Sequence, residues 1–341
     1  MSGPVPWLPA AVGVPLSWCY GAAVGLRNAW WAHRTPLEAR VPVVSVGNLV
    51  VGGSGKSPMV RWIAERLAAS GRHPAIALRG YRRSEDPRLP AGDEAAEHAR
   101  LLPGVPLAVG ADRSAAIAAL LARSPAVDVV VLDDGFQHRR LARRLDVVLV
   151  DATRAGLDDR LLPAGWLREP PSGLARADAV VVTRASAVDA AFADRIEELH
   201  GRPPVAWCTH ALQDVTLCEG GREERWGVEW LAGRRLGTVS AIARPETFDL
   251  ALREAGARVV PLRALRDHSA FSDADLARAA AAARDAGVDA VACTMKDWVK
   301  LAPLADRLGL PVAVPRVGIR MVAGEAALVE LVVAASMPPV H

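Results

Sequence analysis

A glycine-rich stretch followed by Lys-Ser contains the residue types that most directly suggest chemistry. After an apolar run ending at Gly47-Asn48, the chain reads Val50-Val-Gly-Gly-Ser-Gly-Lys-Ser57, and a helical pattern begins. Glycines let backbone N–H groups curve around phosphate oxygens, a helix N-terminus adds its positive dipole end, and a lysine reaches the β- and γ-phosphates. The predicted nucleotide-binding residues are Val51, Gly52, Gly53, Ser54, Gly55, Lys56 and Ser57.

One position departs from the strict Gly-x-x-x-x-Gly-Lys-Ser/Thr string, because Val50 stands where the first glycine belongs. A glycine-rich turn that merely precedes a helix is the simpler reading. Lysine usage favours the phosphate loop, since only three of the 41 basic residues are lysines: Lys56, Lys296 and Lys300. A lysine directly after Gly55 rarely arises by chance in such a chain, and arginine does not replace a compact ammonium there.

A second pattern is an apolar strand that ends in two carboxylates. Val129 to Leu132 is followed by Asp133-Asp134. In this Walker B arrangement, a carboxylate at the end of a strand orders the Mg²⁺ that bridges the β- and γ-phosphates. The predicted metal ligands are Ser57 with either Asp133 or Asp134. Many buried strands end in Asp at a turn, so this pattern alone is a weak signal. Together with Lys56 it indicates a nucleotide site.

The two carboxylates belong to a longer string, Leu132-Asp-Asp-Gly-Phe-Gln-His-Arg139. It resembles a signature of the bacterial tetraacyldisaccharide 4'-kinases, the lipid A 4'-kinase family. The resemblance covers about Pro42 to Leu301, and further motifs follow in the family's order: Ser45-Val-Gly-Asn-Leu49, Arg79-Gly-Tyr-Arg-Arg83, Gly92-Asp-Glu94, Asp112-Arg113, Leu161-Leu-Pro-Ala-Gly165, Leu167-Arg-Glu-Pro170, Arg266-Asp-His268 and Thr294-Met-Lys-Asp297.

The resemblance implies an activity. Family members transfer the γ-phosphate of ATP, with Mg²⁺, to the 4'-hydroxyl of a tetraacylated glucosamine disaccharide 1-phosphate, giving lipid IV-A. They work at the cytoplasmic face of the bacterial inner membrane, so the implied partners are this glycolipid and the membrane surface. The disaccharide is expected between the two domains, with its acyl chains against the N-terminal helix.

The resemblance also implies roles for residues. The Asp of Gly-Asp-Glu, here Asp93, would accept the hydroxyl proton with help from the His of Asp-His, here His268. By the same resemblance, Lys56, Arg113 and Arg168 would neutralise charge on the transferred phosphate. Tyr81 and Gln137 would line the cleft.

The residue types alone leave other roles open. Asp93 could be the N-cap of a helix that begins at Glu94. Arg168 and Glu169 could pair with each other on the surface, and Lys296 and Asp297 could form a plain ion pair.

The elements that must position these residues follow an α/β pattern. After Pro42, short β-branched runs alternate with Ala-rich helical stretches, which predicts βα units around a mostly parallel sheet of the P-loop NTPase type. The nearly uninterrupted apolar runs are typical of strands covered on both faces. Strands are predicted at 43–46, 75–78, 127–132, 147–150 and 179–183, and helices at 57–69, 94–101, 113–122 and 187–200.

The pattern changes after about Pro203. Runs at 214–218 and 225–230 flank Gly220-Gly221 and predict two antiparallel strands. A second α/β series follows, with strands at 237–241, 258–261, 290–294 and 312–314 and helices at 245–255, 273–286, 298–308 and 324–335. The predicted division is an N-terminal apolar helix (1–41), a P-loop nucleotide-binding α/β domain (42–203), a β connector (204–234) and a smaller C-terminal α/β domain (235–341).

The N-terminal segment has no charged side chain from Ser2 to Leu26, a length that could span a membrane. Prolines interrupt its first half and no positive residue precedes the apolar run, which argues against a span and excludes a signal peptide. The predicted helix, 16–32, combines aromatic residues with nearby arginines, which suits a helix lying at the membrane surface. A core helix beneath the first domain is the other reading.

Composition excludes several classes. A net charge of +3 gives no basic surface for nucleic acid, and 51% hydrophobic residues exclude a mostly disordered chain. The scattered cysteines suggest neither a disulfide framework nor a zinc site. The sequence does not specify an oligomeric state.

The alternative function is a membrane-associated P-loop ATPase switch of the partitioning-ATPase type. Such proteins carry a lysine immediately before the glycine pair of the loop, where this chain has Val51. A soluble small-molecule kinase would leave the apolar, aromatic N-terminus without a role.

Overall fold

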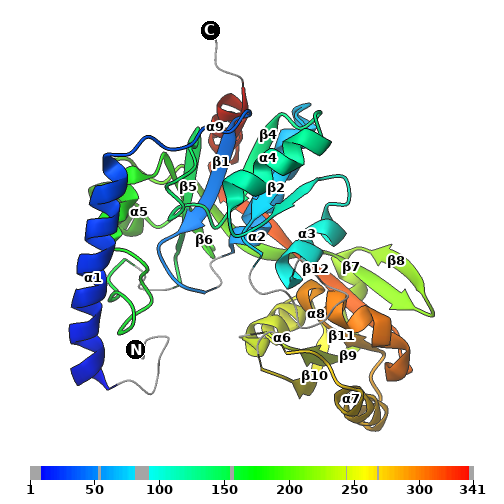
Figure 1. Cartoon of the computed structure of the whole chain (residues 1–341). Coiled ribbons are helices and arrows are strands. Elements are labelled where there is room, and N and C mark those ends of the chain that lie inside the picture. The colour runs from blue at the N-terminus through cyan, green and yellow to red at the C-terminus, as the bar shows by residue number, and fades with distance from the viewer. Residues whose placement is uncertain are drawn as a thin grey trace. The chain divides into compact units, whose positions relative to one another are not determined.

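The computed structural model describes residues 9–52, 55–80, 92–153, 157–242, 244–266 and 269–337. The chain forms two compact units that interleave in the sequence (Figure 1). Unit 1 comprises residues 1–79, 102–210 and 319–341, and unit 2 comprises residues 80–101 and 211–318. Strands β7 (Ala206–Glu219) and β12 (Val312–Ala323) carry the chain from one unit to the other.

The sheet of unit 1 places the phosphate-loop strand at its centre. Its order is β7-β6-β5-β1-β4-β2-β3, and the paired strands are parallel. The strands are β1 (Val43–Asn48), β2 (Pro74–Leu78), β3 (Leu107–Val109), β4 (Val129–Asp133), β5 (Leu145–Asp151) and β6 (Ala179–Thr183). Because β1 and β4 are neighbours in register, Val46 lies opposite Asp133, and the ends of both strands meet at one edge.

The helices of unit 1 are α1 (Ala10–Ala32), α2 (Lys56–Ala69), α4 (Arg113–Arg123), α5 (Ala190–His200) and α9 (Glu325–Ser336). Ile117 and Leu120 of α4 pack with Val130 and Leu132 of β4 in one buried cluster. Helix α9, the last element of the chain, contacts α2 and β1 (Figure 1). Burial of apolar side chains on the strands is what holds these helices to the sheet.

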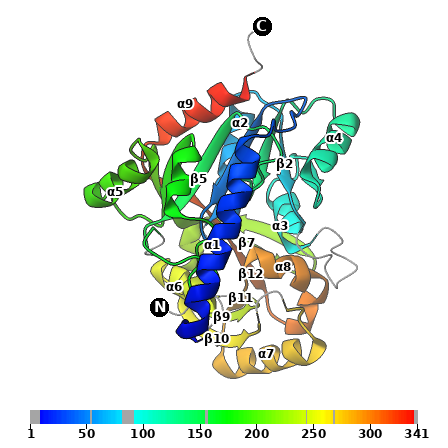
Figure 2. The ribbon, with the colours of Figure 1, turned by 60° about the vertical axis from the view of Figure 1, so that its left-hand side comes forward.

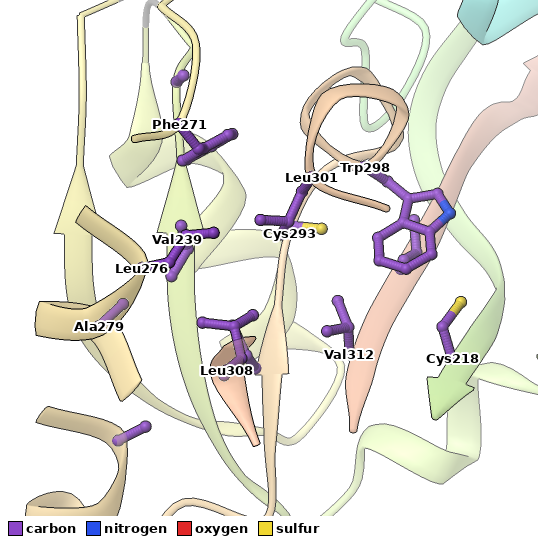
Figure 3. Close-up of a cluster of buried hydrophobic side chains, with 14 of the residues drawn as sticks. Cys218, Val239, Phe271, Leu276, Ala279, Cys293, Trp298, Leu301, Leu308 and Val312 are labelled. Carbon is purple, nitrogen blue, oxygen red and sulfur yellow. The ribbon is translucent and has the colours of Figure 1, made fainter. Parts of the chain in front are cut away.

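Unit 2 has a smaller sheet with the order β10-β9-β11-β12-β7, and β8 pairs antiparallel with β7. Its other strands are β8 (Arg222–Trp226), β9 (Arg235–Ser240), β10 (Arg258–Ala264) and β11 (Ala290–Ala292), and its helices are α3 (Asp93–Leu101), α6 (Pro245–Glu254), α7 (Asp273–Ala286) and α8 (Met295–Leu301). Figure 3 shows its core, where Trp298 and Leu301 of α8 point into the cluster that contains Cys293 and Val312.

The predicted fold class is confirmed: the sheet is mostly parallel and the chain is α/β. β6 and α7 have the predicted bounds. The helix predicted at 298–308 begins earlier, at Met295, and becomes a 3-10 helix at Ala302–Leu308, because Pro303 has no N–H to continue the α-helical bonds. The strand predicted at 225–230 lies at Arg222–Trp226 and is followed by a 3-10 turn.

The grouping into units differs from a division by chain position. Helix α3 lies against α8 in unit 2, although it precedes β3 and α4 of unit 1 in the sequence. Strand β12 returns the chain to unit 1, so α9 lies there. Each unit is therefore built from segments far apart in the sequence.

Helix α1 begins at Ala10, before the predicted start, and includes Pro15. None of the helices within the described ranges has both the length and the hydropathy to cross a bilayer.

Candidate active site

The phosphate loop leads into a helix whose N-terminus has no side-chain cap. Helix α2 begins at Lys56, and its N-cap residue, Gly55, has no side chain that could accept from the first N–H groups. These donors can therefore bind an anion. Gly55 has a left-handed φ of 81°, and a Cβ there would collide with the His210 ring, so only glycine fits. Gly52 also has a positive φ, whereas Gly53 and Ser54 lie outside the described residues.

The structure explains the valine that departs from the strict loop motif. Val50 is buried and forms an antiparallel bridge with Leu167, and the Val51 N–H donates to the Trp166 carbonyl at 2.8 Å. The Arg168 N–H in turn donates to the Leu49 carbonyl at 2.7 Å. A strand-forming residue at position 50 thus fixes the start of the loop and brings Arg168 to it.

Lys56 lies where the sequence predicts, beside both phosphate-site patterns. Its Nζ donates to Asn48 Oδ1 at 3.2 Å and lies 3.5 Å from Asp134 Oδ1. Asn48 is the last residue of β1 and is buried, so its amide oxygen fixes the ammonium of Lys56 at the end of that strand.

The two aspartates after β4 have different partners. Asp133 is buried and accepts a hydrogen bond from the Ser57 hydroxyl at 3.1 Å. Asp134 has a left-handed φ of 54°, and its carboxylate accepts from Arg168 Nη1 at 2.8 Å to each oxygen. Burial raises the pKa of Asp134, but Lys56 and Arg168 outweigh it and hold that pKa below its ordinary value. Asp134 is therefore a carboxylate shared by cations.

Arg113 reaches the same place from the start of α4. It is buried, and its guanidinium donates to the Asp134 carbonyl oxygen at 3.3 Å. Three of the predicted phosphate-site cations, Lys56, Arg113 and Arg168, thus converge on one aspartate.

The Gly-Phe-Gln part of the signature builds the back of the site. Phe136 is buried against Gly47, where an added Cβ would lie 2.5 Å from Phe136 Cβ. Gln137 donates from Nε2 to the Asn48 carbonyl at 2.9 Å and to Glu169 Oε1 at 2.8 Å. Gln137 is therefore beside the phosphate loop, as predicted.

Glu169 is a functional neighbour that the sequence reasoning missed. The expected surface pair of Arg168 with Glu169 is wrong: Glu169 is fully buried and pairs with Arg176 at 2.7 Å, while Arg168 turns to Asp134. Glu169 also accepts from Asn28 of α1 at 3.5 Å, and the Tyr20 hydroxyl donates to the Arg168 carbonyl at 2.9 Å. Helix α1 is thereby connected to the phosphate site, a link that needs three distant segments and leaves no sequence signal.

Asp93 lies in unit 2, at the first residue of α3. Its Oδ2 is 3.4 Å from Lys300 Nζ, and the Asp93 side chain is 10% exposed. His268 and Tyr81 lie outside the described residues, so the predicted pairing of Asp93 with His268 stays a prediction. Asp297 forms an ion pair with Lys300 at 3.7 Å.

This geometry can hold a nucleotide phosphate and a cation in unit 1. Comparison with known proteins also indicates a nucleotide-dependent enzyme. The sequence matches the family model LpxK, described as tetraacyldisaccharide-1-P 4'-kinase, over residues 10–336. The chain belongs to this family. As a member it is a kinase of the lipid A disaccharide, and an ATPase switch is not supported.

Individual relatives agree. The chain is 40% identical over 284 residues to the tetraacyldisaccharide 4'-kinase of Geobacter metallireducens, covering 79% of this chain and 81% of that protein. It is also 40% identical over 343 residues to that of Anaeromyxobacter dehalogenans, covering 93% and 89%. The crystal structure of LpxK from Aquifex aeolicus in complex with ATP is 27% identical, with a TM-score of 0.72 over 95% of this chain and 98% of that chain.

Proposed function

We propose that this chain transfers the γ-phosphate of ATP to the 4'-hydroxyl of a tetraacyldisaccharide 1-phosphate, with Asp93 as the base. The observation that carries the proposal is the meeting of Lys56, Ser57 and Asp133 where β1 and β4 end. In phosphoryl transfer, alignment and charge neutralisation supply most of the catalysis.

ATP fits the uncapped N-terminus of α2. The N–H groups at this helix end and Lys56 would bind phosphate oxygens. Arg168 would stabilise the negative charge on the phosphate group while it is transferred to the acceptor. Binding would also change the partners of Lys56, because phosphate competes with Asp134 for the ammonium.

Mg²⁺ fits the oxygen donors of Ser57 and Asp133, which already lie within hydrogen-bond distance of each other. When bound, the ion would neutralise charge between the β- and γ-phosphates. Within the described residues, no group of three or more His, Cys, Asp or Glu side chains could hold a metal ion. Phosphate oxygens and water molecules would complete the coordination.

The 4'-hydroxyl needs a group that takes its proton as phosphate is transferred. A carboxylate suffices for this step, because the hydroxyl becomes acidic as its bond to phosphorus forms. Asp93, at the N-terminus of α3, is the candidate, and it comes from a different unit than the phosphate loop.

We further propose that α1 contacts the cytoplasmic face of the bacterial inner membrane. Three polar side chains of α1 bond to the protein: the Ser17 hydroxyl donates to the Leu161 carbonyl at 2.9 Å, and Tyr20 and Asn28 also make hydrogen bonds. Several large apolar side chains are exposed instead, including Leu16, 46% exposed, and Leu26, 74% exposed. A helix facing water usually has the opposite arrangement.

Four of the exposed apolar residues of α1 form a stripe. On a helix that turns about 100° per residue, Val12, Leu16, Leu26 and Trp30 lie within about 80° of one another. Arg34 lies 3.8 Å over the Trp30 ring at the end of the stripe, which suits the headgroup layer. The acyl chains of the substrate would be presented at the same surface.

A thin-layer assay with γ-labelled ATP and the disaccharide 1-phosphate tests the reaction. We expect a labelled glycolipid from the wild type, and a loss of about 10²–10⁴-fold in kcat for Asp93→Ala with ATP binding retained. The absence of labelled product from the wild type would overturn the proposed reaction. Unchanged turnover by Asp93→Ala would remove Asp93 from the role of base.

Cosedimentation with vesicles of phosphatidylethanolamine and phosphatidylglycerol tests the membrane contact. Leu16→Ser with Leu26→Ser should reduce the bound fraction several-fold, because each change removes an exposed apolar side chain. The matched control is Leu250→Ser with Leu331→Ser, which changes two exposed leucines of α6 and α9. Equal loss of binding in both variants would argue against α1 as the contact.

A further inference from the structure

A buried lysine lies next to the proposed base. Lys300, on α8 of unit 2, is only 5% exposed, and its Nζ lies 3.4 Å from Asp93 Oδ2. Burial of an ammonium is costly unless anionic or polar partners surround it. Nζ also lies 3.7 Å from Asp297 Oδ1 and donates to the Ser269 carbonyl at 3.3 Å. The lysine thus joins three segments of unit 2.

The second carboxyl group is held rigidly. Asp297 is fully buried, accepts from the Thr294 hydroxyl at 2.8 Å, and accepts from the Ala241 N–H at 3.1 Å. Burial raises the pKa of Asp297, while the Thr294 hydrogen bond and Lys300 lower it. Because its oxygens are already bonded to the protein, Asp297 fixes one side of Lys300 and leaves the other side for Asp93.

Helix α8 is itself anchored. Thr294 caps its N-terminus by accepting from the Asp297 N–H at 3.2 Å. Trp298 and Leu301 are buried in the core of unit 2, as Figure 3 shows. Residues 297 and 300 are one turn apart on the helix, so the core that holds Trp298 and Leu301 also fixes the position of Lys300.

We propose that Lys300 is a positioning residue for phosphoryl transfer: it orients the Asp93 carboxylate. This inference rests on the proposed role of Asp93 as base. The Lys300 ammonium lies 3.4 Å from Asp93 Oδ2, and this ion pair restricts rotation of the carboxylate that would accept the hydroxyl proton.

Other ionisable groups lie on the same two helices. Glu94, Glu97, His98 and Arg100 are on α3, and Lys296 is on α8. Arg100 pairs with Glu223 of β8. Lys300 also bonds to the residue that directly follows His268 in the sequence, so it connects the chain segments of both residues predicted to handle the proton.

The test is the steady-state kinetics of Lys300→Met and Lys300→Arg. In Lys300→Met, we expect kcat near neutral pH to fall about 10- to 100-fold while the KM for ATP stays within about twofold. Lys300→Arg keeps a cation beside Asp93 and should recover most of kcat.

Two controls separate positioning from folding. Arg263→Met breaks another ion pair of unit 2, to Asp275 at 2.7 Å, and should leave kcat within about twofold of the wild type. Lys300→Gln replaces Lys300→Met if that variant does not fold, as judged by thermal unfolding. Unchanged kcat in the folded variant without the ammonium, or no recovery of kcat in Lys300→Arg, would overturn the inference.

The outcomes also distinguish this inference from the proposed function. If Asp93→Ala is inactive and the kcat of Lys300→Met equals that of the wild type, Asp93 remains the base and only the role of Lys300 fails. If the wild type makes no labelled glycolipid, the proposed function itself fails.

Discussion

Lys56 and Lys300 both lie beside aspartates, but the balance of charge around them is opposite. In unit 1, the side chains of Lys56 and Arg168 share the Asp134 carboxylate, and Arg113 donates to the carbonyl of the same residue. In unit 2, the carboxyl groups of Asp93 and Asp297 share one lysine. The first site has surplus cations, and the second has surplus carboxyl groups.

This difference matches what each site must receive. Surplus cations are suited to a polyanion such as a nucleotide phosphate, which can displace Asp134 from Lys56. Surplus carboxyl groups are suited to a proton, and the Lys300 ammonium lies between the two groups and pairs with both. The exposed fractions are consistent with these roles, because the lysine that must meet a nucleotide is the more exposed one. The Lys56 side chain is 13% exposed, whereas that of Lys300 is 5% exposed.

Changing each lysine to arginine gives the largest expected contrast. Lys56→Arg should lower kcat/KM about 10²–10³-fold, because a planar guanidinium cannot replace an ammonium within the phosphate loop. Lys300→Arg should retain most activity, because only the charge is needed there. Steady-state kinetics with both substrates measures the contrast, and similar losses in both variants would contradict it.

The two aspartates of unit 1 offer a second test. Asp133→Asn should raise the Mg²⁺ concentration for half-maximal activity by about tenfold or more, because Asp133 is the partner of Ser57. Asp134→Asn should raise it less, since Asp134 is occupied by Lys56 and Arg168. Titration of both variants with Mg²⁺ ranks them, and the reverse order would assign the metal to Asp134.

A change at Glu169 tests whether its contacts stabilise the link between α1 and the phosphate site of unit 1. Glu169→Gln should lower the free energy of unfolding by about 1–3 kcal/mol, because it leaves Arg176 without its buried carboxylate. Glu325→Gln, in the exposed pair with Arg66, is the control and should change it by about 0.5 kcal/mol or less. Urea unfolding measures both, and equal effects would deny Glu169 a special role.

Acid should have the smallest effect, through two histidines of unit 1. Burial, with nearby arginines, lowers the pKa of His138 and of His210 to about 4. An unfolded chain has ordinary histidines and binds more protons between pH of about 6.5 and 4, so the free energy of unfolding should fall as pH falls through this range. Thermal unfolding at about pH 7 and pH 5 measures this. His138→Gln should show a smaller decrease than the wild type, and an equal decrease would remove His138 as a cause.

The sequence predicts local features of unit 1 well. Lys56, Ser57, Asp133 and Gln137 belong to short motifs at the ends of apolar strands, and parallel strands bring such ends together. Strand β3 escapes prediction because it has only three residues and is defined by pairing with β2.

Relations between distant segments could not be predicted. The contacts of Glu169 with α1 and Arg176, and of Lys300 with Asp93, depend on how helices pack. Lysine scarcity pointed to Lys300 in the sequence, but it gave no partner for the ammonium. The hydrogen bonds of Ser17, Tyr20 and Asn28 of α1 could not be predicted either, because their partners lie in distant segments of the chain.

The return of β12 to unit 1 has a consequence for biosynthesis. Leu328 and Val332 of α9 are fully buried, and α9 covers part of α2 and β1, the elements on either side of the phosphate loop. A ribosome makes α9 after all of unit 2. Until α9 is made, the apolar surface of unit 1 that it covers should stay open to chaperones and proteases.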